Sequence, residues 1–65
     1  MPTHAARQAY TRWVLEDTRY QAARMEDQAS PATGLEKERR VNLLAGMAKQ
    51  VKDAWDQYIA AKEQP

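Results

Sequence analysis

Hydrophobic positions in the second half of the chain recur at spacings of three and four. Five of them form one row: Leu44, Met47, Val51, Trp55 and Tyr58. Neighbouring apolar residues widen this row on both sides: Val41, Leu43, Ala48, Ala54 and Ile59. Polar residues fill the opposite side: Glu38, Asn42, Lys49, Asp53, Asp56 and Gln57. The pattern predicts an amphipathic helix over about residues 34–62. Its apolar arc covers about 160°, which is wider than the roughly 100° needed against a single neighbouring helix. We therefore expect two helices to pack against it.

The first half predicts a second helix over about residues 4–29, and it carries two apolar rows. One is small and aliphatic: Val14, Leu15, Thr18, Ala22, Met25 and Ala29. The other, rotated by about 100°, is largely aromatic and is interrupted by Asp17 and Arg24: Ala6, Ala9, Tyr10, Trp13 and Tyr20. We expect Val14, Leu15 and Thr18 to pack against the other helix, since small side chains allow close approach. We expect Tyr10, Trp13 and Tyr20 to lie outside the contact between the two helices. Their row includes charged side chains, and a charge is costly in a core unless it is paired.

Residues that break helices are concentrated in the segment Ser30-Pro31-Ala32-Thr33-Gly34. This segment predicts a turn over residues 30–34 between antiparallel helices. Thr33 and Glu36 fit a capping box at the start of the second helix, and Ser30 before Pro31 is a competing N-cap. Gly46 is the one other internal breaker, and a break there would give three helices. The fold expected is therefore all-α, a single helical-hairpin domain over residues 1–65.

The shortness of the chain favours assembly with another chain. A chain of 65 residues buries only about 60% of its unfolded surface. Chains of this size usually need a disulfide, a bound metal or an oligomer to be stable. There is no cysteine for a disulfide, and His4 is the only histidine. Neither a metal nor a cofactor is therefore expected. We expect two hairpins to dimerise into a four-helix bundle, a layout that resembles the Rop-type plasmid proteins in architecture, with no shared motif.

The aromatic row is the leading candidate for a binding site. Tyrosine, tryptophan and arginine dominate binding hot spots, so the row could recognise a protein partner through five side chains: Tyr10, Trp13, Asp17, Tyr20 and Arg24. The alternative is that the rings belong to the core or to a homodimer interface. The two charged residues keep the partner-binding hypothesis open.

A nucleic-acid surface is a weaker candidate. Arg12 and Arg19 lie one heptad apart on the polar side of the first helix and could contact phosphates, but Glu16 and Glu26 flank them. Ten basic and nine acidic residues leave a net charge of only +1. The run from Glu36 to Arg40 alternates in sign and is better explained by exposed pairs such as Glu36–Arg40.

The function expected is that of a small non-enzymatic regulator, a homodimer that binds and modulates another protein. Carboxylate pairs on the helices have no histidine, cysteine or glycine-rich loop beside them that would suggest catalysis. A nucleic-acid-binding regulator of similar shape and a secretion-type chaperone or adaptor remain alternatives. No apolar run approaches the roughly 20 residues of a membrane span, and a cytoplasmic accessory protein of a bacterium, phage or plasmid is expected.

Overall fold

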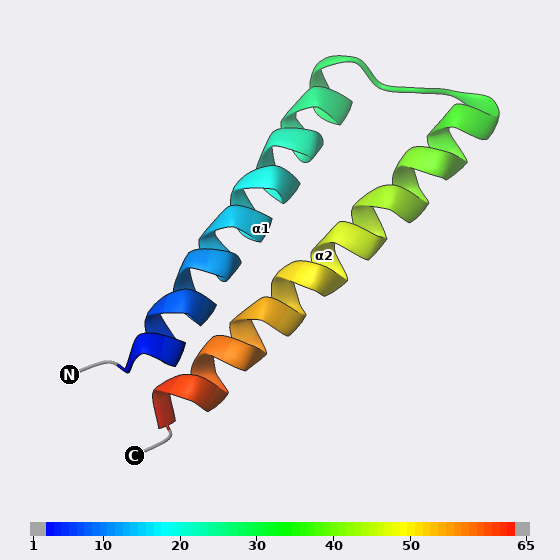
Figure 1. Ribbon diagram of the computed structural model, residues 1–65. Coiled ribbons are helices and arrows are strands. Elements are labelled where there is room, and N and C mark those ends of the chain that lie inside the picture. Colours follow the sequence, from blue (N-terminus) through cyan, green and yellow to red (C-terminus); the bar gives the residue numbers. More distant parts are fainter. Residues whose placement is uncertain (1–2, 64–65) are drawn as a thin grey trace.

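The computed structural model describes residues 3–63 and consists of two long helices joined by a short turn. Helix α1 spans His4–Ala29 and helix α2 spans Gly34–Glu63. The helices lie side by side and run in opposite directions, so that the start of α1 is beside the end of α2 (Figure 1). The expected all-α hairpin is confirmed, and α2 ends one residue later than predicted. Pro2 and Pro65 lie outside the described residues.

Both ends of α1 are closed by local hydrogen bonds. The Thr3 hydroxyl accepts from the Ala6 amide at 3.1 Å, as an N-cap side chain does. At the other end, the Ser30 amide donates to the Glu26 carbonyl at 3.0 Å. Ser30 is thus the C-cap of α1, and the hypothesis that it caps the start of the second helix is wrong. The reason is that α1 continues through Ala29, which commits the Ser30 backbone to the first helix.

Helix α2 begins at Gly34, where the backbone conformation favours a glycine. Gly34 has a φ of +62°, in the left-handed region that residues with a Cβ adopt at a cost. The Glu36 carboxylate lies 3.5 Å from the guanidinium of Arg40, which confirms the predicted pair. Further along, α2 runs through Gly46 without a break, so residues 3–63 form two helices and not three.

The core between the helices is a thin seam. Among the described residues only Ala6 and Ala54 are fully buried, and both are small. Larger side chains of the seam are partly buried: Trp13, Tyr20, Leu44, Met47, Val51 and Tyr58. The apolar row predicted for the second helix therefore does face α1, although its member Trp55 stays 39% exposed. The body measures 50 × 16 × 10 Å, and within residues 3–63 no residue outside this seam is fully buried.

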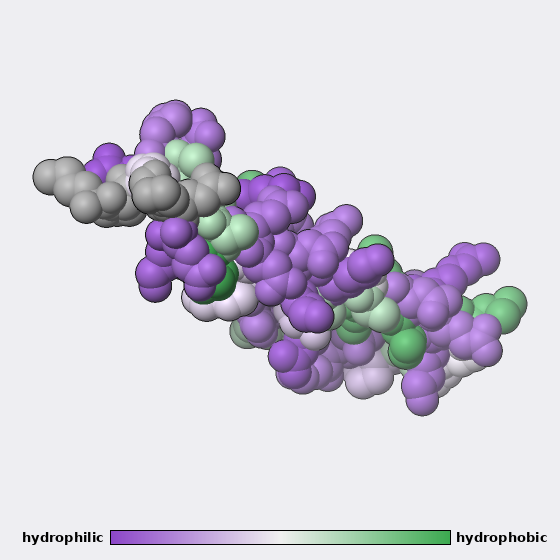
Figure 2. All heavy atoms as spheres, turned by 90° about the horizontal axis from the view of Figure 1, so that it is seen from below, coloured by the Kyte–Doolittle hydropathy of each residue, from purple (hydrophilic) through white to green (hydrophobic). Residues whose placement is uncertain are grey.

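Large hydrophobic side chains remain on the surface of the hairpin. Eight of them are exposed in the described part of the chain: Tyr10, Val14, Leu15, Met25, Leu35, Val41, Leu43 and Trp55. On the face seen in Figure 2, green hydrophobic atoms lie among the polar ones, several of them toward the end opposite the grey terminal residues. Neither described helix combines the length and the apolar character needed to cross a bilayer.

Candidate interaction surface

Four aromatic rings meet near the open end of the hairpin, two from each helix. The Trp13 and Trp55 rings are 4.8 Å apart between centroids, and those of Tyr10 and Tyr58 are 5.3 Å apart. Within each helix, Tyr10 lies 5.7 Å from Trp13 and Trp55 lies 5.4 Å from Tyr58. All four pairs are tilted or edge-on, the arrangements that aromatic quadrupoles favour. This aromatic cluster packs the two helices together near the end of the hairpin that has no turn.

The position of the cluster corrects the predicted orientation of the first helix. Val14 is 39% exposed, Leu15 is 48% exposed and Thr18 is exposed, so this row does not form the seam. Instead Trp13 packs on Trp55 across the hairpin. The expectation that the aliphatic row packs on α2 and the aromatic row lies outside is wrong. Rings bury more apolar surface than small aliphatic groups, and this gain decides which face turns inward.

The charges in the aromatic row do not prevent its packing, because they lie at the edge of the seam. Asp17 is only partly buried, and Arg24 is exposed. The Arg24 guanidinium lies 5.6 Å from the centre of the Tyr20 ring, a cation–π distance. A charge that retains contact with water escapes most of the cost of burial in a core. The penalty for turning this row inward is therefore smaller than that for burying the two charges fully.

The structure divides the five predicted partner-binding residues between two settings. Tyr10 and Trp13 belong to the aromatic cluster, while Tyr20 and Arg24 form their own pair between the middle of α1 and the turn. Tyr10 and Arg24 are exposed, and Asp17 is partly buried between these two groups. Their contact with a partner protein stays a prediction.

The two arginines considered for phosphate binding are both exposed, and one of them holds the helices together. Arg12 donates a hydrogen bond to the Gln57 side chain at 2.7 Å, across the seam. Arg19 is one heptad further along the same side of α1. A contact between Arg12 and nucleic acid would compete with this bond to α2.

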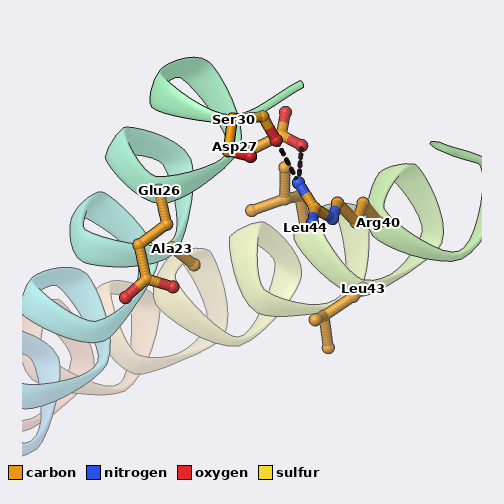
Figure 3. Close-up of a pocket in the computed structure, with 7 residues that line it drawn as sticks. All are labelled: Ala23, Glu26, Asp27, Ser30, Arg40, Leu43 and Leu44. Atoms are coloured by element: carbon orange, nitrogen blue, oxygen red, sulfur yellow. Dashed lines mark hydrogen bonds and ion pairs between the residues drawn. The ribbon is translucent and has the colours of Figure 1, made fainter. Parts of the chain in front are cut away.

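Arg40 has a structural role that could be predicted only in part from the sequence. Within α2, its guanidinium lies 3.5 Å from the Glu36 carboxylate. It also donates to the Ser30 carbonyl at 2.6 Å and to the Asp27 carboxylate at 3.4 Å (Figure 3). These contacts tie α2 to the end of α1 across the turn. Only the pair with Glu36 could be read from sequence spacing, since the others depend on how far apart the two helices stand.

Beside Arg40, the turn end of the hairpin contains an open hollow of about 350 Å³. It is lined by seven residues: Ala23, Glu26, Asp27, Ser30, Arg40, Leu43 and Leu44. Glu26 points away from Arg40 in Figure 3, so its carboxylate and that of Asp27 do not converge. Among residues 3–63, no three histidine, aspartate or glutamate side chains come together as metal ligands would. The polar groups that converge in the hollow, from Arg40, Asp27 and Ser30, are bonded to one another.

By its geometry this chain is a two-helix antiparallel hairpin with a thin seam and exposed apolar side chains. Comparison with known proteins finds no protein family, no curated protein and no solved structure that matches it.

Proposed function

We propose that the chain is a non-enzymatic protein that acts by association: two copies form a four-helix bundle, and the assembly binds and modulates another protein. The observation that carries the proposal is the thinness of the core. The two fully buried residues are alanines, whereas eight large hydrophobic side chains are exposed in the described part of the chain. Isolated surface hydrophobics are ordinary, but apolar surface in excess of the core is typical of chains that bury it against a partner.

The accessible surface of the hairpin supports self-association. It amounts to 5285 Å². A folded monomer of 7.5 kDa is expected to expose about 4,200 Å². The difference of roughly 1,000 Å² is close to the ~800 Å² that each partner contributes to a standard interface.

Light scattering coupled to size-exclusion chromatography, over a range of micromolar concentrations, tests the first half of the proposal. We expect a particle of twice the 7.5 kDa chain mass, with a melting temperature that rises with concentration because dissociation accompanies unfolding. A monomer that melts sharply at a concentration-independent temperature would contradict self-association.

The second half, binding of another protein, is tested by salt and nuclease. Binding to a protein partner through aromatic and aliphatic groups should survive nuclease treatment and change little between 50 and 200 mM salt. Binding to nucleic acid through residues such as Arg12 and Arg19 should weaken steeply over that range. Loss of the partner on nuclease treatment would favour the nucleic-acid alternative.

A further inference from the structure

The seam leaves the hairpin with two broad faces, and these differ in character. The Arg12–Gln57 hydrogen bond crosses one of them. At about 100° per residue, this polar face also carries Glu16, Arg19 and Gln50. Two exposed large hydrophobic residues also lie on this side: Leu43, which lines the hollow together with Ala23 and Glu26, and Leu15, which lines a second hollow with Arg12.

The opposite face gathers most of the exposed apolar surface. On α1 the residues Tyr10, Val14 and Met25 follow one line along the helix, and on α2 Val41 and Trp55 lie two heptads apart with Ala48 between them. In two antiparallel helices these lines flank the seam on the same side. We call this surface the open face, and it is defined by five of the eight exposed large hydrophobics: Tyr10, Val14, Met25, Val41 and Trp55.

We infer that the open face is the surface on which a second copy of this chain docks, with the same face of that copy turned toward it. The inference rests on the self-association proposed above and adds which surface is used. A twofold interface needs one self-complementary patch. The hairpin as a whole has enough surface for such an interface, since its excess of roughly 1,000 Å² is about what one partner of a standard interface contributes.

Charge also favours a second copy as the occupant. Asp17 lies mid-way along α1, and Lys52 is almost level with it on α2, because Trp13 meets Trp55. The open face thus carries charges of both signs, with Asp17 and Lys52 near its middle and the exposed Arg24 one heptad from Asp17. A twofold-related copy can offer a positive group to Asp17 and a negative group to Lys52. The net charge of +1 leaves little repulsion between two copies.

Two neighbouring residues of α2 give a matched test. Val41 is 57% exposed on the open face, and Leu43 is 61% exposed on the polar face. In sedimentation equilibrium, Val41→Asp should raise the dimer dissociation constant more than about tenfold, because the interface would bury an unpaired carboxylate. Leu43→Asp should change it by less than about threefold, as surface substitutions do. Equal effects of the two variants, or a larger effect of Leu43→Asp, would overturn the assignment of the face.

A second measurement avoids any disruptive charge. The chain has no cysteine, so Val41→Cys and Leu43→Cys each introduce a single thiol. Alkylation of the Val41→Cys thiol should slow at least fivefold when the concentration rises from below to above the dissociation constant, while the Leu43→Cys thiol keeps its rate. Protection of neither thiol in a chain that is dimeric by mass would refute the open face and leave self-association intact. A wild-type chain that stays monomeric would refute both.

Discussion

Replacement of Trp13 by alanine is the sharpest test of which face of α1 turns inward. The Trp13 ring packs against Trp55 and Tyr10, and the side chain is mostly shielded from water. An indole of this kind buries at least about 150 Å², which at about 25 cal/mol per Å² corresponds to nearly 4 kcal/mol. Since the unfolded chain is itself partly compact, we expect a loss of about 3 kcal/mol. The free energy of unfolding of a chain this small is roughly 3–10 kcal/mol, so Trp13→Ala should lose from about a third to all of it.

Urea denaturation followed by far-ultraviolet circular dichroism measures this loss, at one chain concentration because association adds to the stability. Leu15→Ala is the control. Leu15 is 48% exposed on the outer side of α1, and its replacement should cost less than about 1 kcal/mol. A Trp13→Ala variant as stable as the wild type, or a Leu15→Ala variant that loses more than Trp13→Ala, would show that α1 is rotated relative to the structure.

Further substitutions test the turn, the helix and the seam, each by thermal and urea melting. Gly46→Ala should raise the free energy of unfolding by about 0.5–1 kcal/mol, because the added methyl group meets nothing within 4 Å. Gly34→Ala should lower the free energy of unfolding by about 1 kcal/mol, because φ at this position is +62°. A gain at Gly34 would mean that this backbone is not left-handed. Arg40→Met should cost about 1 kcal/mol through loss of the bond to the Ser30 carbonyl, and wild-type melting would show that the turn does not need it. Val51→Asp, in the seam, should lose about 2 kcal/mol or more and most of its helicity, unlike Asn42→Asp on the exposed side of α2.

The hairpin and its bounds could be read from the sequence because their signals are local. The turn residues from Ser30 to Gly34 and the good helix formers on both sides fix where the helices begin and end. The inward face of α2 was also predictable, since the row from Leu44 to Tyr58 is the one wide apolar stripe on that helix. A helix with a single apolar side leaves no choice of rotation.

The rotation of α1 could not be read in the same way, because that helix has two apolar rows of similar strength. The choice depends on what α2 offers opposite. Trp55 and Tyr58 provide flat rings that pair with Trp13 and Tyr10, and no pattern within α1 alone contains this information. The contacts of Arg40 were equally hidden, since they depend on the distance between helices at the turn. The packing of particular side chains of α1 against those of α2 determines both the rotation of α1 and the contacts of Arg40.

The meeting of Trp13 and Trp55 gives the protein a built-in optical signal for closure of the hairpin. They are its two tryptophans, they lie in different helices, and their rings are 4.8 Å apart. Each helix could form while the two indoles remain far apart in space, so helical content and indole proximity are separate observables. Coupling between the indole transitions, seen as a paired band in the near-ultraviolet dichroism, arises only after residues 42 positions apart in the chain have come together. Stopped-flow experiments that follow this band beside the 222 nm signal would time helix formation and helix docking independently, without any attached label.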